Sequence, residues 1–237
     1  MAEKVNLENI LFLDIETVPL EKNFADTDET TQLLWEKKST QFRKEGQTAA
    51  EVYQRAGIYA EFGRVLVISC GFFYYSKDRG GVFRVKSFYG DDEKVVLKEF
   101  CETLSKLNNF ILCAHNGKEF DFPFLARRIL INRQKLPPQL NIAGKKPWEI
   151  PHLDTMEMWK FGDYKNFTSL AVLSYVFGLP SSKDDIDGSQ VADIYYQTGD
   201  IKRITKYCEK DMIAVARIFQ CMRGENPLKD DDLEFTE

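Results

Sequence analysis

The feature that most constrains this chain is a short apolar segment that ends in two acidic residues. Residues 10–16 read Ile-Leu-Phe-Leu-Asp-Ile-Glu, and Pro19 follows closely. An apolar run of this length, ended by a proline, is typical of a buried β-strand. Side chains alternate along a strand, so Asp14 and Glu16 face the same side. The chain therefore places two neighbouring carboxylates either at a solvent-facing edge or beside a cation that compensates them.

Two further predicted elements carry acidic residues near apolar segments. Asp121 follows an apolar strand at 110–114 and opens a helix among phenylalanines. Tyr207 and Asp211 are four residues apart, so they share a helix face, on the flank of an apolar stripe. Each of these residues alone has an ordinary interpretation, as a helix-start acid that favours the helix dipole or as a boundary residue. Taken together, four acids on three elements predict a site for a hard cation.

The ligand chemistry of these acids narrows the choice of metal. Oxygen ligands without histidine suit Mg²⁺ or Mn²⁺ rather than zinc. Two such ions about 4 Å apart can hold a phosphodiester, one generating the attacking hydroxide and the other stabilising the leaving oxygen. Three or four carboxylates neutralise that much positive charge. We therefore expect two divalent metal ions, Mg²⁺ or Mn²⁺, as cofactors.

Composition excludes several other classes of protein. Of the 237 residues, 43% are hydrophobic and 29% charged, which is typical of a globular protein. The net charge of −5 argues against a broadly basic protein that coats nucleic acid, although it allows a local basic groove. No apolar run approaches the roughly 20 residues of a membrane helix, and no signal peptide is visible. Five cysteines without a CxxC pair favour reduced thiols. A cytoplasmic protein without a membrane partner is expected.

The order of predicted elements indicates one mixed α/β domain over residues 1–237, with a sheet flanked by helices. Turn residues separate the two strands of a predicted hairpin, and apolar residues at helical spacing predict most of the helices. The predicted elements are a strand at 10–16, a polar insertion at about 20–62 with one or two helices, hairpin strands at 64–75 and 82–89, a helix capped by Asp91 or Asp92, a strand at 110–114, a helix at 120–133, a strand at 150–156, a helix at 168–177, mostly helix up to 222, and a polar tail at about 223–237.

Three motifs resemble those of a known superfamily. Residues 12–17 read FLDIET, residues 116–121 read NGKEFD and residues 207–211 read YCEKD. They resemble the three exonuclease motifs of the DEDD superfamily, and the YxxxD spacing is that of its DEDDy variant. A DEDDh enzyme would have histidine where this chain has Lys206. The chain is similar to predicted stand-alone 3′–5′ exonucleases related to the proofreading domain of family B DNA polymerases.

The resemblance implies a ribonuclease H-like fold and a role for each acid. Asp14 would bridge both metals, and Glu16 and Asp211 would hold the metal that carries the nucleophilic water. Asp121 would reach the second metal through water, and Tyr207 would orient the nucleophile. The residues themselves do not assign which acid binds which ion.

The resemblance also implies a substrate and the residues that contact it. Thr17 would approach the terminal 3′-hydroxyl, and Asn116 and Phe120 would line the path of the strand. Lys183 would contact a phosphate. The expected activity is release of nucleoside 5′-monophosphates from single-stranded DNA, because chemistry at a terminus needs the last bases unpaired. An exoribonuclease is an alternative, since contacts to the 2′-hydroxyl are not readable here. A second alternative is a non-catalytic adaptor that binds nucleic acid. In such an adaptor, loss of one of the four acids would be expected.

Three other features have two interpretations each. His115 precedes Asn116 and either borders the substrate or serves packing. Asp154 lies on the predicted strand at 150–156 and could support the site. The aromatic residues at 72–75 either stack on bases or alternate between core and surface.

Overall fold

The computed structural model describes residues 5–78, 80–181 and 185–236. Its centre is a six-stranded mixed sheet with the strand order β5-β4-β1-β2-β3-β6. Strands β1, β2 and β3 form an antiparallel meander, β4 and β5 extend it in parallel on one side, and β6 pairs in parallel with β3 on the other. The strands are β1 (Ile10–Pro19), β2 (Gly63–Ser76), β3 (Gly80–Tyr89), β4 (Ile111–Ala114), β5 (Leu153–Asp154) and β6 (Leu233–Thr236).

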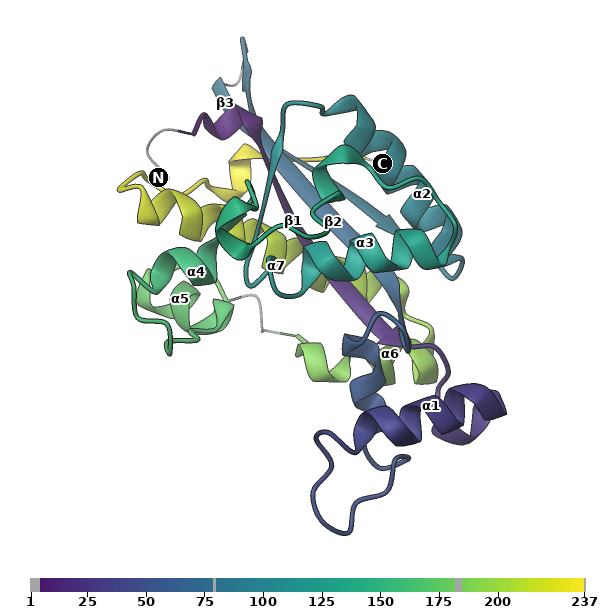
Figure 1. Ribbon diagram of the computed structural model, residues 1–237. Helices are drawn as coiled ribbons and strands as arrows, with labels where there is room; N and C mark the ends of the chain where they lie inside the picture. Colours follow the sequence, from purple (N-terminus) through teal and green to yellow (C-terminus); the bar gives the residue numbers. More distant parts are fainter. Residues whose placement is uncertain (1–4, 79, 182–184, 237) are drawn as a thin grey trace.

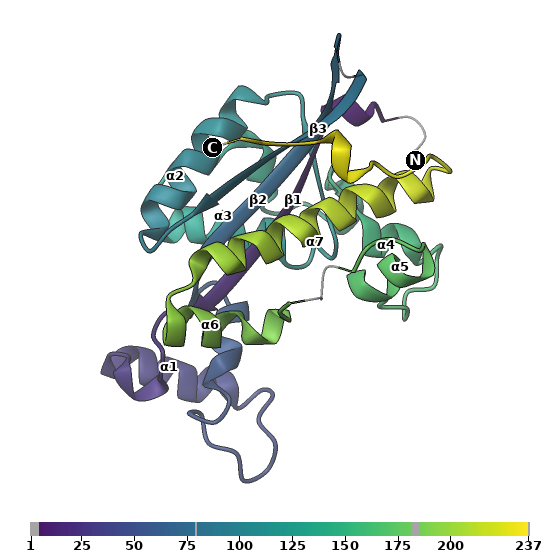
Figure 2. The ribbon, with the colours of Figure 1, turned by 180° about the vertical axis from the view of Figure 1, so that it is seen from behind.

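Helices cover both faces of this sheet (Figure 1). Two of them, α2 and α3, lie on one face, and the long helix α7 lies on the other, as the view from behind shows (Figure 2). The predicted α/β class, with a central mixed sheet flanked by helices, is confirmed. The helices are α1 (Glu29–Ser39), α2 (Glu93–Lys106), α3 (Asp121–Ile131), α4 (Thr155–Trp159), α5 (Leu170–Val176), α6 (Val191–Thr198) and α7 (Ile201–Met222).

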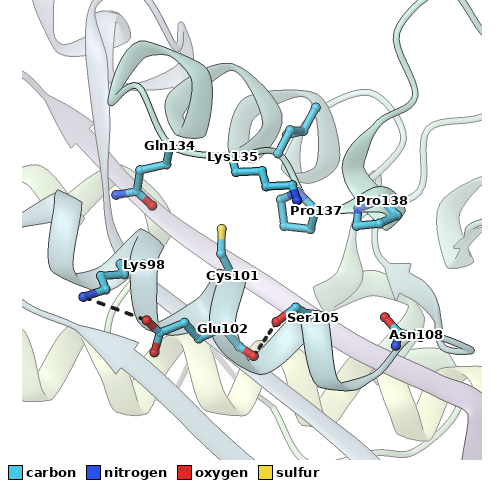
Figure 3. A pocket seen from close by; sticks show the side chains of 10 residues that line it. Lys98, Cys101, Glu102, Ser105, Asn108, Gln134, Lys135, Pro137 and Pro138 are labelled. Atoms are coloured by element: carbon cyan, nitrogen blue, oxygen red, sulfur yellow. Dashed lines mark hydrogen bonds and ion pairs between the residues drawn. The ribbon is translucent and has the colours of Figure 1, made fainter.

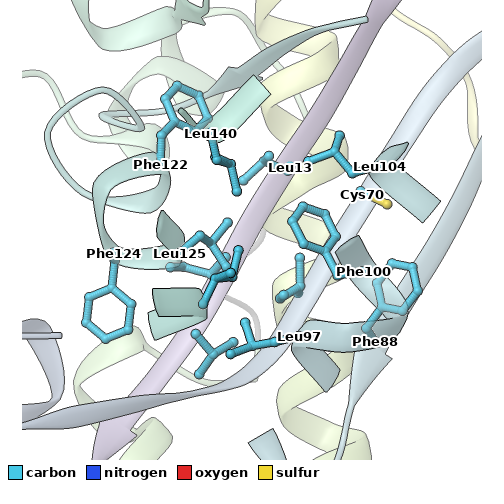
Figure 4. Close-up of a cluster of buried hydrophobic side chains, with 14 of the residues drawn as sticks. Leu13, Cys70, Phe88, Leu97, Phe100, Leu104, Phe122, Phe124, Leu125 and Leu140 are labelled. Atoms are coloured by element: carbon cyan, nitrogen blue, oxygen red, sulfur yellow. The ribbon is translucent and has the colours of Figure 1, made fainter. Parts of the chain in front are cut away.

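The alternation of β1 distributes its side chains between two cores. Leu13 and its neighbours of the same parity pack with α2 and α3, in the core that Figure 4 shows. Ile10 and Phe12 face the other way and pack against residues of α7, among them Phe219. Because Asp14 and Glu16 continue the series of Ile10 and Phe12, both carboxylates lie on the α7 face of the sheet.

The segment at 150–156 is only briefly a strand. Leu153 and Asp154 pair with β4, and helix α4 begins at Thr155. The Asp154 carboxylate accepts hydrogen bonds from the backbone N–H groups of Met156 and Glu157, which is a typical N-cap. The cap residue therefore turns the chain into a helix where hydrophobicity alone predicts a longer strand.

The residues at 223–237 include an ordered strand. The short helical turn η8 (Asp230–Asp232) leads into β6, whose Leu233 to Thr236 pair with Phe83 to Lys86 of β3. Glu234 accepts hydrogen bonds from the Tyr74 hydroxyl and from Arg84 Nε, at 2.7 and 2.8 Å. Polar composition predicts a tail here, but partners from two other strands hold this segment on the sheet.

The insertion, residues 20–62, has a small core of its own. It contains one α-helix, α1, and the helical turns η3 (Phe24–Asp26) and η4 (Tyr53–Ile58), and it projects from one end of the sheet (Figure 1). Trp35 is fully buried among aromatic rings that include Tyr53 and Tyr59, and its indole N–H donates to the carbonyl of Ala49 at 3.0 Å. The insertion is polar in overall composition, but it encloses a compact cluster of aromatic side chains.

Within the described ranges, none of the helices has the length and apolarity needed to cross a membrane. All five cysteines lie within those ranges and are free thiols.

Candidate active site

Four carboxylates from three elements come together around β1. Asp14 and Glu16 lie on β1, opposite Ser69 and Val67 of β2. Asp121 opens α3, where the backbone of Ile15 hydrogen-bonds to its carboxylate, and Asp211 is buried in α7. Asp14 interacts electrostatically with each of the other three. We call Asp14, Glu16, Asp121 and Asp211 the carboxylate cluster.

Burial and mutual repulsion make the ionised state of these acids costly. Burial, followed by the charges of Asp211 and Asp121, raises the pKa of Asp14 and that of Glu16 well above their ordinary values. Burial also raises the pKa of Asp121 to about 7. Among the described residues, the charged groups that shift these three pKa values are all carboxylates, and none is a lysine or arginine. The cluster therefore favours an added cation.

The donor set fits a divalent metal ion. Single ligand atoms of Asp14, Glu16 and Cys208 lie within 4.8 Å of one another. The remaining acids of the carboxylate cluster bring the carboxylates to four, which suits a hard cation such as Mg²⁺ or Mn²⁺. Repulsion among these acids, seen in their raised pKa values, is what one or two divalent ions would relieve.

Cys208 is a member of the site that sequence reasoning placed only in the core. Its thiol donates to the carbonyl and to a carboxylate oxygen of Asp14, at 3.3 and 3.4 Å. Burial, with the charges of Asp14 and Glu16, raises the pKa of this thiol well above its ordinary value, so it stays protonated as a neutral donor. The signal in the sequence is its position between Tyr207 and Asp211, one helical turn before Asp211.

Tyr207 and Asp211 form one unit on α7, as their spacing predicts. The Tyr207 hydroxyl hydrogen-bonds to the Asp211 carboxylate. Burial, and then the negative charges of Asp211 and Glu16, raise the pKa of Tyr207 far above its ordinary value. The phenol is therefore a hydrogen-bond donor at neutral pH. Asp187 is a further acid near the cluster that the sequence did not single out, and its charge contributes to the raised pKa of Glu16.

The loop between β4 and α3 is held by Asp154. Its carboxylate accepts hydrogen bonds from the backbone N–H groups of Asn116 and Lys118, both at 3.0 Å, in addition to capping α4. Asn116 has φ of 64°, a left-handed conformation that asparagine adopts more readily than most residues. A Cβ on Gly117 would lie 2.4 Å from the Cβ of Ala114, so only glycine fits there. These contacts fix the loop that leads to Asp121.

His115 is engaged within the protein through both ring nitrogens. Nε2–H donates to the carbonyl of Thr168 at 3.0 Å, and Nδ1 lies 2.9 Å from the hydroxyl of Thr155. These bonds connect the loop to α4 and to the segment before α5. They favour the packing interpretation of His115 over a substrate contact. In the aromatic segment at 72–75, Phe72 and Phe73 pack against the two cores on opposite faces of the sheet, Phe73 against Phe12 and Phe83, and Tyr75 is exposed near the end of β2.

The described residues that the sequence predicts to contact substrate line two different cavities. Thr17 and Phe120 line a cavity of about 410 Å³ together with Glu16, and we call it the Glu16 pocket. The register of β1 shifts between Glu16 and Thr17, an irregularity of the kind that redirects side chains beside sites. Asn116 instead lines a cavity of about 120 Å³ beside α4. Lys183 lies outside the described residues.

Another cavity, of about 560 Å³, lies between α2 and the segment after α3 (Figure 3). Cys101 and the ion pair of Lys98 and Glu102 belong to its lining. Its lining contains no member of the carboxylate cluster.

Fold and site together define a class of protein: an α/β domain in which buried carboxylates gather beside the central strand of a mixed sheet. Comparison with known proteins identifies the family. A family model described as "Predicted 3'-5' exonuclease related to the exonuclease domain of PolB" matches residues 58–230, and the chain belongs to this family. The matched span includes Asp121, Tyr207 and Asp211 but begins after Asp14 and Glu16, whose place in the site comes from the geometry of β1.

A solved structure shows the same fold. The family B DNA polymerase from the hyperthermophilic archaeon Pyrobaculum calidifontis is similar to 87% of this chain, with a TM-score of 0.50 and 14% sequence identity. The chain covers 23% of that polymerase chain. The predicted ribonuclease H-like fold and the predicted family are confirmed.

Proposed function

We propose that this protein is a metal-dependent 3′–5′ exonuclease that hydrolyses single-stranded DNA from its 3′ end and releases nucleoside 5′-monophosphates. The observation that carries the proposal is the carboxylate cluster, in which four acids come together from three elements and burial and neighbouring acidic charges raise the pKa of Asp14, Glu16 and Asp121. Membership of a family described as predicted 3′–5′ exonucleases supports the direction of hydrolysis.

The four acids would hold two divalent ions. Asp14 would be the shared ligand, as the resemblance of its motif implies, and its charge interacts with those of all three other members of the cluster. Glu16 and Asp211, which interact with each other, would complete one site, and Asp121 would contribute to the other. When bound, Mg²⁺ or Mn²⁺ supplies the positive charge that binds the phosphodiester and lowers the pKa of the attacking water.

Two neutral donors organise the acids for this task. The Tyr207 hydroxyl, held on Asp211, is protonated at neutral pH and can hydrogen-bond to the attacking water without removing its proton. The Cys208 thiol holds the Asp14 carboxylate in place. Both donors orient the oxygen atoms of carboxylates, so we infer that they position the ligands and the nucleophile rather than take part in proton transfer.

The Glu16 pocket suits the end of a strand. Its volume of about 410 Å³ lies within the range of small-ligand sites, roughly 300–1,000 Å³. Phe120 offers an aromatic side chain to a base, and every base has a π-face, so hydrolysis would be independent of sequence. Thr17 and Glu16 lie in the same cavity, which would place a terminal 3′-hydroxyl beside the carboxylate cluster.

The test is degradation of a 5′-labelled single-stranded oligonucleotide with Mn²⁺ or Mg²⁺. We expect products that shorten from the 3′ end, free nucleoside 5′-monophosphates, and no reaction in EDTA. The Asp14→Asn variant should be inactive, while Asp78→Asn, at an exposed position in the β2–β3 turn, should retain activity. An RNA oligonucleotide of the same sequence, tested with the same preparation, distinguishes a deoxyribonuclease from an exoribonuclease. Full activity of Asp14→Asn would refute the proposal.

A further inference from the structure

The insertion reaches the Glu16 pocket. Beside Glu16, Thr17 and Phe120, this cavity is lined by residues of η4, at the end of the insertion, among them Arg55 and Ile58. The opposite side is closed by the segment at Gly188, where a Cβ would lie 3.7 Å from the Tyr207 hydroxyl. A segment that leaves the sheet after β1 thus returns to the same site as the carboxylate cluster.

The return of the insertion is fixed by close packing against β1. A Cβ on Gly57 would lie 3.2 Å from both N and Cδ of Pro19, so η4 approaches the end of β1 as closely as a glycine allows. The backbone N–H of Leu20 donates to the carbonyl of Phe62 at 3.0 Å, which closes the insertion at its base. The Tyr196 hydroxyl of α6 donates to the carbonyl of Pro19 at 2.6 Å. This side of the pocket is therefore held by backbone contacts.

The aromatic core of the insertion supports η4 from behind. Tyr53 and Ala56 are buried in that core, whereas Arg55 and Ile58 on the same turn are exposed. Ile58 is 50% exposed and lines the same cavity as Phe120, so apolar side chains from two separate segments share the pocket. The Arg55 guanidinium lies over the Phe42 ring, 4.3 Å from its centroid. Contact through the face of a guanidinium leaves the N–H groups at its edge available to an anion.

We propose that the insertion forms one wall of the pocket for the 3′-terminal nucleotide. This inference rests on the proposed function and deepens it. Ile58 and Phe120 contact the terminal base from different segments, and Arg55 binds a phosphate oxygen of the strand. A fixed wall beside the terminal base leaves no room for a partner base, so a paired end has to fray before it enters.

The experiment compares Ile58→Ala and Arg55→Gln with matched variants elsewhere in the insertion. Leu33→Ala removes an apolar side chain that is 73% exposed on α1, and Lys44→Gln removes an exposed positive charge. We expect Ile58→Ala to raise KM for a single-stranded oligonucleotide about tenfold, with kcat within about twofold of the parent. Arg55→Gln should raise KM and flatten its dependence on salt. Leu33→Ala and Lys44→Gln should leave both constants at parent values.

Binding without turnover provides a second readout. In the Asp14→Asn background with Ca²⁺, fluorescence anisotropy of a 5′-labelled oligonucleotide should show weaker binding for Ile58→Ala and parent-like binding for Leu33→Ala. Ile58→Phe, which keeps an apolar surface, should bind as tightly as the parent. If Ile58→Ala keeps the KM and the affinity of the parent, the proposal that the insertion contacts the terminal nucleotide is refuted. A fall in kcat together with a lower melting temperature would also refute it. A parent protein that degrades no oligonucleotide would instead refute the proposed function, so the two failures are distinguishable.

Discussion

Glu93 on α2 and the carboxylate cluster beside β1 are both buried, but their surroundings differ. The Glu93 carboxylate accepts hydrogen bonds from Arg128 Nε and Asn132 Nδ2, each at 2.8 Å, and from the backbone N–H of Val65 at 2.7 Å. A second nitrogen of Arg128 completes a two-point ion pair. At Asp14, the neighbours are three other acids and one thiol.

The difference shows that this fold pairs one buried acid with a cation, whereas the charges that shift the pKa values of Asp14, Glu16 and Asp121 come from other acids. A buried carboxylate without a partner is costly, and a group of them is more costly still. Arg128 removes this cost at Glu93 and connects α2, α3 and the end of the insertion, since it also donates to the carbonyl of Ala60. At the carboxylate cluster, the proposed divalent ions would lower this cost.

The largest expected effect comes from removing one member of the carboxylate cluster. Asp211→Asn keeps the shape of the side chain and an acceptor for Tyr207, but deletes a ligand charge. We expect exonuclease activity to fall by at least about 10³-fold. The free energy of unfolding in EDTA should stay the same or rise, because a repulsive charge is lost. Urea denaturation and a nuclease assay measure the two quantities, and a large loss of stability would contradict the comparison with Glu93.

The corresponding change at Glu93 should act on stability instead of activity. Arg128→Met leaves the buried Glu93 carboxylate without its ion pair, so the free energy of unfolding should fall by about 3–5 kcal/mol. Activity per folded molecule should be retained at low temperature. The double variant Glu93→Met and Arg128→Met should recover most of the stability, because both charges are removed. If Arg128→Met unfolds no more easily than the parent, the ion pair contributes little.

The buried imidazole of His152 gives a third case, in which hydrogen bonds within the protein stabilise the neutral form. His152 Nε2–H donates to the carbonyl of Gln139 at 2.7 Å, and Nδ1 accepts from the backbone N–H of Leu112 at 3.1 Å. Burial lowers the pKa of His152 from 6.5 to about 4. A proton on Nδ1 would also face the N–H of Leu112.

Because the pKa of His152 is lower in the folded state, its contribution to stability is complete above pH 6.5 and is lost as the pH falls towards 4. The loss should reach roughly 3 kcal/mol. Urea denaturation of the parent and of His152→Gln between pH 7.5 and 4.5 should show a smaller decline for the variant. An NMR titration that gives His152 an ordinary pKa near 6.5 would contradict this explanation.

The smallest expected effect is that of the metal on folding. If Mn²⁺ binds the folded carboxylate cluster and not the unfolded chain, a concentration of a hundred times Kd should raise the free energy of unfolding by about 2.7 kcal/mol. Asp211→Asn should show a much smaller gain, and Arg128→Met should keep the gain of the parent. Thermal denaturation with and without Mn²⁺ measures it. Equal stabilisation of the parent and Asp211→Asn would mean that the metal binds elsewhere.

Much of the fold and of the site geometry follows from local patterns in the sequence. Strand alternation puts Asp14 and Glu16 on one side of β1, and helical spacing puts Tyr207 and Asp211 on one side of α7. These inferences hold because neighbours in the sequence determine which way a side chain points. The apolar run before Asp14 also indicates a central strand, and β1 does lie between β4 and β2.

Other features depend on contacts between distant segments, and local patterns do not contain them. Nothing in the residues around Ile58 indicates that η4 returns to the end of β1. The apolar neighbours of Cys208 on its helix indicate a core residue, and only its contact with Asp14 makes it part of the site. The sequence indicates Asp154 as an acid that could support the site, but its bond to the backbone of Asn116 depends on the pairing of β5 with β4.

The pairing of β6 with β3 has a consequence for how molecules of this protein behave beside one another. Without β6, the outer side of the ten-residue strand β3 would offer a row of backbone donors and acceptors to any other extended chain. With it, the outermost strand has four residues and carries Glu234, bound to Arg84 and Tyr74. A strand this short and charged is a poor template for β-pairing between molecules, so we expect it to disfavour aggregation through this edge of the sheet.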